Sequence, residues 1–460
     1  MNFKELFNPR TIAVIGANES EGFGGAVCKN LANDIDDENR VFYVNPKRDM
    51  LFGKICYHSI KDIPVDIDLL IISVNKKLVI NVLKEGKEKG AKAAVVFASG
   101  FSETGRSEDV LLEKEMLKVA DELDITILGP NCAGFSNYIN GINAFAFLSE
   151  ERERRGNIGI VSQSGMIALS LIDNQYPKFS YNISCGNANG LKIHDIINFL
   201  VEDEDTKVIG LYIDGIKDLA EFEKAIKNAY NKRKQVVLIK SGSNDRTKII
   251  TKIHTGSDEE FTDEEFNKLI TQYSVIRCMD LEEFIYTTSC VSCYDRLPHG
   301  NRIASINLSG GEAAIVGEVS YKFAFNFPSF NEKVTGELKE KLPEYANISN
   351  PLDMTVSLSY DVEKFSNTLE SIMVQDDIDM VVIGYTLLNH IDDPCIYYMI
   401  EAIKRTKEIL KDKIKPIFIL SFMSNTRNQK IIDKLTELGI VVLPSPYYGF
   451  KVIENLIKLA

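Results

Sequence analysis

The sequence predicts an α/β fold built from parallel sheets with crossover helices. Short runs rich in β-branched residues alternate with helical patterns along nearly the whole chain, as in repeated strand–helix–strand units. The chain has 460 residues, which exceeds one ordinary hydrophobic core and suggests about three domains. Two later segments also open alike, each with a strand, a Ser-Gly pair and a helix.

The first α/β unit contains enough expected strands for a complete domain, which we place at residues 1–145. The strands are separated by segments such as KKLVINVLKEGKEKG, which has helical periodicity. The expected strands are TIAVIGA (11–17), VFYVNP (41–46), LLIISV (69–74), AAVVFAS (93–99) and ITILGP (125–130).

The two following units are expected at residues 146–298 and 299–460. Their shared opening, IVSQSGMIALSL and INLSGGEAAIVG, indicates two related doubly wound domains. The expected strands are IGIVSQ (158–163), VIGLYIDG (208–215) and QVVLIKSG (235–242), then RIASINLS (302–309), DMVVIGYTL (379–387), PIFILSF (416–422) and GIVVLPS (439–445).

Composition excludes several classes of protein. Apolar residues make up 45% and charged residues 26%, as in soluble globular proteins. The net charge of −13 argues against a nucleic-acid or membrane partner, since either would need a basic face. We expect a cytoplasmic chain, because it shows no signal peptide or membrane span and its eight cysteines are scattered. Cys290 and Cys293 lack a second pair, so no metal site is expected.

The glycine-rich segment after the first expected strand is a candidate nucleotide-binding loop. It runs from Gly16 to Gly25 and includes Ala17 and Asn18. Glycines at a strand-to-helix turn let backbone N–H groups approach a pyrophosphate, which the helix N-terminus also attracts. The spacing is not a strict G-x-G-x-x-G, and a turn that only needs positive φ would have similar glycines.

The next strand end favours one kind of nucleotide. An NAD site usually has an acidic residue there, whereas this chain has Lys47 and Arg48. Two cations favour an extra phosphate, as in coenzyme A or NADP, although a solvated basic turn would look the same. Other strand ends carry Val74, Asn131 and Cys132. These could line the same cleft, because ligands bind beyond the carboxyl ends of the strands.

A series of segments points to one family by their type and order. They are RTIAVIGA, VNPK, ASGFSETG, GPNCAGFSN, GIVSQSG, FSYNISCGN, VIGLYIDGIKD, the interval from KSG to HTGS, and NPLDMT. Through them the chain resembles the α subunit of the nucleoside-diphosphate-forming acyl-CoA synthetases, the ADP-forming acetate–CoA ligases related to succinyl-CoA synthetase. The resemblance covers essentially the whole sequence.

The resemblance implies an N-terminal Rossmann-like CoA-binding domain followed by two flavodoxin-like, doubly wound ligase domains. It also implies a separate ATP-grasp β subunit that handles Mg-ADP and Mg-ATP, because no segment here resembles the ATP-grasp portion. Coenzyme A, acyl-CoA and phosphate would be the small-molecule substrates.

The family pattern also assigns binding residues. Coenzyme A would contact Gly16, Ala17, Asn18, Lys47 and Val74, with Asn131 and Cys132 toward its thiol; the alternative for Cys132 is a buried structural cysteine. Phosphate would bind at Ser162, Gln163, Ser164 and Gly165. Small and polar residues between a strand and a helix do expose several N–H donors, although a plain helix cap has the same composition.

His254, in the segment KIHTGS, is the expected catalytic residue. In the family, the histidine of an H-T-G-S loop takes a phosphoryl group from an acyl phosphate and passes it to ADP. A neutral imidazole suits this step, because it offers a lone pair near pH 7 without first losing a proton. By the same resemblance, the carboxylate of Asp214 orients the histidine.

Three departures from the family pattern bear on this expectation. Asp214 replaces a usual glutamate and is shorter by about 1.5 Å. The pattern G-N-E-A-D appears here as GNANG, residues 186–190, without the two acidic groups. HTGS is followed by the acidic segment 258–260, and a carboxylate about 8 Å from a phosphoryl charge costs about 2 kcal/mol at an effective dielectric of 20.

These observations predict the α subunit of an ADP-forming acyl-CoA synthetase that works through acyl phosphate and phospho-His254. The alternative is a CoA-binding regulatory or assembly subunit that has lost phosphoryl transfer. A third reading, an NADP-dependent oxidoreductase, has no assignable hydride-site residues. The acyl group and the choice between ADP and GDP stay open at this stage.

Overall fold

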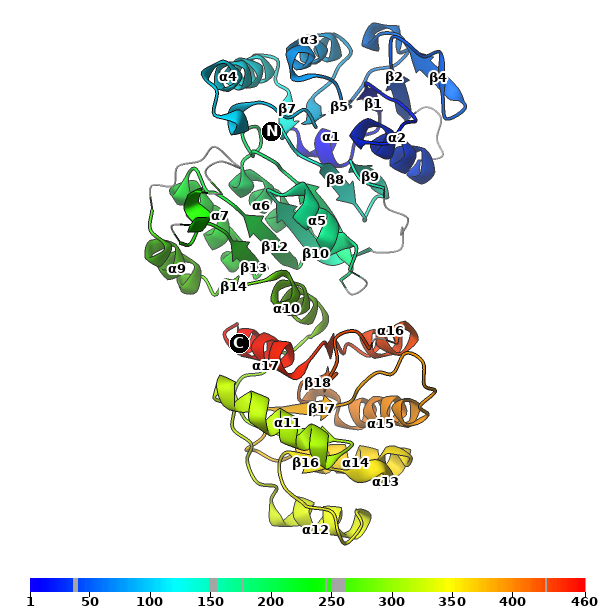
Figure 1. Cartoon of the computed structure of the whole chain (residues 1–460), viewed down its shortest axis with the longest axis vertical. Helices are drawn as coiled ribbons and strands as arrows, with labels where there is room; N and C mark the ends of the chain where they lie inside the picture. Colours follow the sequence, from blue (N-terminus) through cyan, green and yellow to red (C-terminus); the bar gives the residue numbers. More distant parts are fainter. Residues whose placement is uncertain are drawn as a thin grey trace. The chain divides into compact units, whose positions relative to one another are not determined.

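The structure, a computed structural model, describes residues 1–35, 40–148, 155–174, 177–244, 246–249, 251, 261–426 and 428–459. The chain divides into two compact units, Met1–Leu281 (unit 1) and Glu282–Ala460 (unit 2). Across the described residues it forms three sheets, two in unit 1 and one in unit 2 (Figure 1). In that same part of the chain, no helix has the length and apolar character needed to cross a membrane.

The first sheet has the strand order β3-β4-β2-β1-β5-β6-β7, and only β3 runs antiparallel to its neighbour. All five strands expected for this part are confirmed. Its strands are β1 (Ile12–Ile15), β2 (Val41–Val44), β3 (Met50–Leu51), β4 (Lys54–Tyr57), β5 (Leu69–Ile72), β6 (Ala93–Val96) and β7 (Thr126–Leu128). The helices around it are α1 (Phe3–Phe7), α2 (Phe23–Asp34), α3 (Val79–Glu88) and α4 (Ser107–Glu122).

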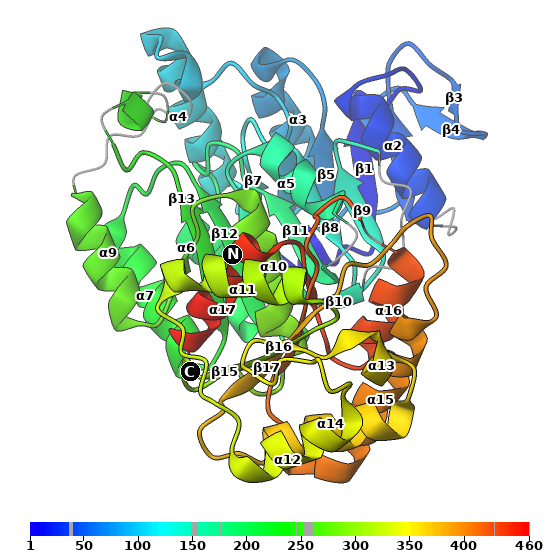
Figure 2. The same cartoon turned by 60° about the horizontal axis from the view of Figure 1, so that its bottom comes forward.

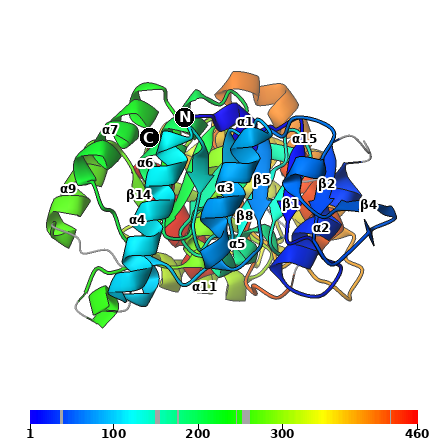
Figure 3. The same cartoon turned by 90° about the horizontal axis from the view of Figure 1, so that it is seen from above.

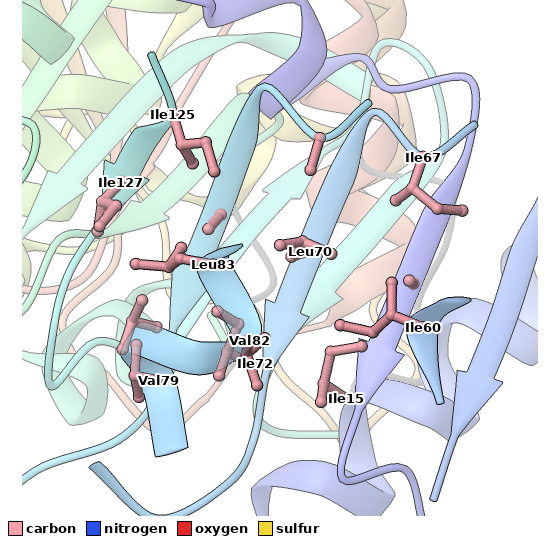
Figure 4. Packing of buried hydrophobic residues seen from close by; sticks show 14 of the residues in the cluster. Ile15, Ile60, Ile67, Leu70, Ile72, Val79, Val82, Leu83, Ile125 and Ile127 are labelled. Atoms are coloured by element: carbon pink, nitrogen blue, oxygen red, sulfur yellow. The ribbon is translucent and has the colours of Figure 1, made fainter. Parts of the chain in front are cut away.

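The core of the first sheet explains its continuous apolar strands. Strands β1, β5 and β6 are buried along their whole length, because helices cover both faces of a parallel sheet. Helices α3 and α4 lie side by side (Figure 3). Figure 4 shows Leu70 of β5 packed with residues of α3. A Cβ on Gly86 of α3 would lie 2.3 Å from Leu70 Cδ1, so this glycine allows the close approach of helix and sheet.

The second sheet has the order β14-β13-β12-β10-β11-β8-β9. Its parallel part follows the flavodoxin-like order 2-1-3-4-5. Helix α5 lies on one face, and α6 and α7 lie together on the other (Figure 1). The strands are β8 (Gly134–Asn137), β9 (Ile142–Phe145), β10 (Arg155–Ser162), β11 (Phe179–Ser184), β12 (Val208–Ile213), β13 (Gln235–Lys240) and β14 (Ile276–Arg277). The helices are α5 (Gly165–Ile172), α6 (Ile193–Glu202), α7 (Leu219–Asn231) and α9 (Asp263–Gln272).

The antiparallel hairpin β8–β9 was not anticipated by the alternation of strands and helices. It pairs with β11 of the second sheet, yet it also packs on helices of the first part. The ring centroids of Phe7 and Phe135 are 5.1 Å apart, and Asn30 Nδ2 donates to the carbonyl oxygen of Phe145 at 2.9 Å. The division into domains 1–145, 146–298 and 299–460 therefore stays a prediction, since strands ending at Phe145 belong to the second sheet.

Unit 2 contains the third sheet, in which all neighbours are parallel in the order β16-β15-β17-β18-β19. This is again the order 2-1-3-4-5. Helices α11 and α17 pack together, and α14 packs on α15 (Figure 2). The strands are β15 (Ile303–Asn307), β16 (Leu352–Asp353), β17 (Met380–Gly384), β18 (Ile417–Leu420) and β19 (Val442–Leu443). The helices are α10 (Leu281–Cys293), α11 (Gly310–Ser320), α12 (Glu332–Lys341), α13 (Thr355–Ser359), α14 (Val362–Met373), α15 (Cys395–Leu410), α16 (Gln429–Glu437) and α17 (Pro446–Ile457).

The expected similarity between the second and third sheets is confirmed. Helices α5 and α11 each follow the first parallel strand of their sheet and are capped by a serine side chain. Ser164 Oγ accepts from the N–H of Ile167, and Ser309 Oγ accepts from the N–H of Glu312. The predicted fold class, a Rossmann-like sheet followed by two flavodoxin-like sheets, is therefore correct.

Replacing Leu70 by alanine tests the core of the first sheet. Leu70 is fully buried, and its truncation leaves a cavity between β5 and α3. We expect the free energy of unfolding, measured by urea denaturation, to fall by about 2–5 kcal/mol. The matched control is Leu111→Ala on α4, where the side chain is 65% exposed and we expect a change within about 0.5 kcal/mol. Equal losses for the two variants would contradict this account of the core.

Candidate functional site

The glycine-rich loop between β1 and α2 is built to hold its backbone close to β5. Gly16 has φ +83°, and a Cβ there would lie 2.4 Å from the carbonyl oxygen of Ser73. Asn18 closes the loop, since its Nδ2 donates to the Gly16 oxygen at 3.1 Å and its Oδ1 accepts from the N–H of Ser20 at 3.1 Å. No residue larger than glycine fits at position 16 without moving the loop.

The N–H groups of this loop differ from the expectation in one respect. Gly16 and Ala17 both donate their N–H groups to the carbonyl oxygen of Val44 on β2, at 2.9 and 3.2 Å. They therefore shape the loop rather than present donors to a ligand. Gly22, the residue before α2, gives the helix no side-chain cap, so the helix start itself is open to an anion.

The remaining residues predicted for coenzyme A lie at neighbouring strand ends. Asn45 joins β2 to the loop, since its Nδ2 donates to the Ala17 oxygen at 2.8 Å and its Oδ1 accepts from the N–H of Lys47 at 3.0 Å. The Lys47 side chain is exposed. Val74 adjoins Gly16, because a Cβ on Gly16 would lie 2.9 Å from Val74 Cγ1. The structure thus brings Gly16, Ala17, Asn18, Lys47 and Val74 together at the carboxyl ends of β1, β2 and β5.

Asn131 and Cys132 follow β7 and have different surroundings. Cys132 is buried, and its Sγ lies 3.4 Å from the carbonyl oxygen of Val96 and 3.6 Å from that of Leu128. Burial raises the pKa of Cys132 to about 12, so the thiol is neutral near pH 7 and forms part of the wall. Asn131 has φ +56° and donates through Nδ2 to Asn187 Oδ1 at 3.1 Å.

The segment Ser162-Gln163-Ser164-Gly165 lies between β10 and α5, as expected. Ser162 Oγ accepts from the N–H of Ser164 at 3.1 Å and donates to the Ser164 oxygen at 2.7 Å, and Ser164 caps the helix. In the part of the chain that the structure describes, no acceptor is recorded for the N–H groups of Gly165 and Met166. The segment therefore acts as a helix cap and still offers two donors to an anion.

Gln163 has a role that the sequence did not reveal. Its side chain is 4% exposed, and Oε1 accepts from the N–H groups of Asp214 at 2.7 Å and Gly215 at 2.9 Å. Lys240 Nζ donates to the backbone carbonyl oxygen of Asp214 at 3.3 Å. The backbone of Asp214 is thus fixed at the end of β12, beside the loop predicted to bind phosphate.

The histidine loop can be followed up to Thr251. A Cβ on Gly242 would lie 3.0 Å from Thr251 Oγ1 and 3.5 Å from Lys240 Nζ, so Thr251 lies beside the lysine that contacts Asp214. His254 and the acidic segment 258–260 lie outside the described residues.

A buried polar network joins the loop at residues 186–190 to the first sheet. Asn187 Nδ2 donates to Glu103 Oε2 at 2.7 Å and to Glu113 Oε2 at 3.3 Å. Asn189 Nδ2 donates to Ser102 Oγ at 3.1 Å and forms a second, short hydrogen bond with Glu113. The loop lacks the acidic residues of the family pattern, yet two carboxylates reach it from the helical segments around α4.

The comparisons agree with this architecture. Residues 10–138 match the model of a CoA binding domain, and residues 155–291 match that of a succinyl-CoA ligase like flavodoxin domain. The chain is 30% identical over 453 residues to acetate–CoA ligase [ADP-forming] II subunit alpha of Pyrococcus furiosus, covering 96% of this chain and 94% of that protein.

Two further matches differ in length coverage. Acetate–CoA ligase [ADP-forming] of Methanocaldococcus jannaschii is 34% identical over 355 residues, covering 76% of this chain and 49% of that protein; the matched part is thus about half of that relative. A solved acetyl-coenzyme A synthetase of Ca. Korarchaeum cryptofilum, in complex with phosphate and ADP, superposes with a TM-score of 0.83 at 25% identity, covering 100% of this chain and 97% of that one. The chain belongs to the family of NDP-forming acyl-CoA synthetases, as an α-type member.

Replacing Gln163 by alanine tests the fixation of Asp214. The buried N–H groups of Asp214 and Gly215 would lose their acceptor, and each unsatisfied donor costs about 1–3 kcal/mol. We expect a matching fall in the free energy of unfolding, measured by urea denaturation. Gln272→Ala, at an exposed position at the end of α9, is the control and should change it by less than about 0.5 kcal/mol. If Gln163→Ala were equally mild, the two hydrogen bonds would not hold Asp214.

Proposed function

We propose that the chain is the α subunit of an ADP-forming acyl-CoA synthetase, which converts acyl-CoA, phosphate and ADP reversibly to a carboxylic acid, coenzyme A and ATP. The observation that carries this proposal is the meeting of four strand-end loops in unit 1, those after β7, β10, β11 and β12. The hydrogen bond from Asn131 to Asn187 joins the loop after β7 to the second sheet, and the hydrogen bonds of Gln163 join the loop before α5 to Asp214.

The proposed coenzyme A site consists of Gly16, Ala17, Asn18, Lys47, Val74, Asn131 and Cys132. Lys47 is exposed at the end of β2, where its ammonium can meet the extra phosphate of coenzyme A while the start of α2 attracts the pyrophosphate. Asn131 and Cys132 would lie toward the thiol. The Cys132 thiol itself does no chemistry in this scheme, because its raised pKa keeps it protonated.

The proposed reaction starts when a phosphate oxygen attacks the thioester carbonyl and the CoA thiolate leaves, which forms an acyl phosphate. The phosphate would be held by Ser162, Gln163, Ser164 and Gly165, where the N–H groups of Gly165 and Met166 stabilise its charge. The imidazole of His254 then attacks phosphorus, and the carboxylate leaves. Asp214 would orient that imidazole through a hydrogen bond.

The phosphoryl group then passes from His254 to an oxygen of the ADP β-phosphate. We propose that ADP and its Mg²⁺ are held by a separate ATP-grasp β subunit, which fits the relative named as a subunit alpha. The working assembly would then be a hetero-oligomer in the cytoplasm, without nucleic acid or membrane. A CoA-binding regulatory or assembly subunit is the less favoured alternative, because the relative that this chain matches over nearly its whole length is named as a ligase subunit.

Replacing His254 by alanine tests phosphoryl transfer. The complete enzyme, the chain with its β subunit, would be incubated with γ-³²P-labelled ATP, and acid-labile, base-stable label on the chain would be counted. We expect the label to vanish in His254→Ala, because no other imidazole takes its place, while His299→Ala keeps wild-type labelling. Coenzyme A binding should persist in both variants. Undiminished label in His254→Ala would contradict the proposed phosphohistidine.

Replacing Gly16 by alanine tests the coenzyme A site. The added Cβ would lie 2.4 Å from a backbone oxygen at φ +83°, and such strain costs about 1–3 kcal/mol. We therefore expect the loop to shift and the affinity for coenzyme A, measured by calorimetry, to fall about tenfold or more. Gly53→Ala is the matched control, since its φ is +71° but nothing lies within 4 Å of the added Cβ. If Gly16→Ala bound coenzyme A as tightly as Gly53→Ala does, the ligand would lie elsewhere.

A further inference from the structure

A cavity of about 240 Å³ opens at the carboxyl ends of the parallel strands of the second sheet. Its lining residues include the starts of α6 and α7, and these two helices lie on the face of the sheet opposite α5 (Figure 1). The apolar part of its wall consists of Ala188, Ile193, Ile216 and Phe222.

The cavity wall is in contact with each part of the proposed active site. Gln163, which lines the cavity, belongs to the proposed phosphate loop and holds the backbone of Asp214. Asn187 also lines it and accepts a hydrogen bond from Asn131 of the proposed coenzyme A site. A group bound in this cavity would therefore lie next to the proposed sites of both phosphate and coenzyme A, with which the acyl group must react.

Two ammonium groups at this cavity converge on one neutral residue. Lys192 Nζ donates to the carbonyl oxygen of Asn189 at 2.6 Å, and Lys217 Nζ donates to Asn189 Oδ1. Over the described ranges of the chain, neither lysine lies within ion-pair distance of a carboxylate. The carboxylate of Glu113 instead accepts hydrogen bonds from the side chains of Ser102, Asn187 and Asn189.

The charge balance at the cavity favours an anion. Burial lowers the pKa of Lys192, and Asp195 and Glu113 only partly oppose that shift, so a nearby anion would stabilise the cation. Asp218 also lines the cavity, but its Oδ1 accepts from the N–H of Glu221 at 3.0 Å as the cap of α7. Two cations that form no ion pair with any described residue, beside an apolar wall, match a carboxylate with an apolar body.

We propose that this cavity binds the carboxylic acid substrate and that Lys192 and Lys217 select its carboxylate. The inference rests on the proposed ligase function and adds the substrate class. The acid carries a branched or aromatic body that contacts Ile193, Ile216 and Phe222, because the methyl group of acetate would leave most of the cavity unfilled.

The test is a ligand-observed NMR titration of the full chain with acetate, isobutyrate, phenylacetate and inorganic phosphate. We expect isobutyrate or phenylacetate to bind about tenfold or more tightly than acetate, since buried methylene groups discriminate by this order. The double variant Lys192→Met, Lys217→Met should lose about tenfold in affinity for these acids. Lys224→Met, exposed on α7, is the matched control and should bind them as the wild type does.

A second variant tests the size of the pocket. Ile193→Phe fills the cavity, and it should weaken phenylacetate binding more than acetate binding. Acetate binding as tight as that of the larger acids, or acid binding unchanged in the double lysine variant, would overturn the proposal, as would an effect of those lysines on phosphate alone.

Coenzyme A affinity, measured in the same samples, distinguishes a failure of the cavity proposal from a failure of the proposed ligase function. Wild-type coenzyme A binding in the lysine variants shows that they are folded. Coenzyme A binding without lysine-dependent acid binding counts against the cavity alone, whereas no coenzyme A binding by the wild type counts against the proposed function.

Discussion

The docking of residues 186–191 onto residues 127–131 is the constraint on which the arrangement of unit 1 depends. The N–H of Leu191 donates to the Ile127 oxygen at 2.7 Å, and that of Gly190 donates to the Gly129 oxygen at 3.0 Å. A Cβ on Gly190 would lie 2.3 Å from the Ile127 oxygen. The two backbones are therefore in direct contact. This contact fixes the distance between the carboxyl ends of the first and second sheets, and so the positions of the loops that follow their strands.

This contact also explains how the chain departs from its family at residues 186–190. An aspartate at position 190, as in the family pattern, would need the two backbones to move apart. Besides Asn187, which the family pattern also has, the loop carries Asn189, and the amide groups of both donate to the carboxylates of Glu103 and Glu113. Because buried carboxylates require such donors, the asparagines and the glutamates form one satisfied network rather than a weakened version of the family loop.

The fold was predicted from sequence to a large extent, because its strands are buried on both faces and read as continuous apolar runs. The segments around β1, β5 and β17 show this clearly, and the Ser-Gly starts of α5 and α11 revealed the relation between the second and third sheets. The hairpin β8–β9 was missed, since its pairing with β11 is antiparallel and crosses from one part of the chain to another. Residues such as Glu113, in the middle of a charged helix, have no local signal for their contact with Asn187 and Asn189, because these asparagines are more than seventy positions away.

The candidate site divides in the same way. Turn-forming residues such as Gly16 and the serines before α5 could be located from their position between a strand and a helix. The role of Gln163 could not be predicted, because a glutamine side chain in a loop has many possible hydrogen-bond partners. Only the fold brings the N–H groups of Asp214 and Gly215 to it. The lysines at the cavity are likewise ordinary surface residues in the sequence, and their convergence on Asn189 arises from the meeting of two loops.

The interleaving of hairpin β8–β9 with the second sheet has a practical consequence for dissecting the protein. A fragment that stops at residue 145 would carry a hairpin whose strand β8 has lost its partner β11, and such an unpaired strand edge promotes self-association. The complementary fragment would leave β11 as an open edge. The two sheets of unit 1 are thus better studied separately by point substitutions than by truncation, and a split of the gene should keep residues 134–145 on the same fragment as β11.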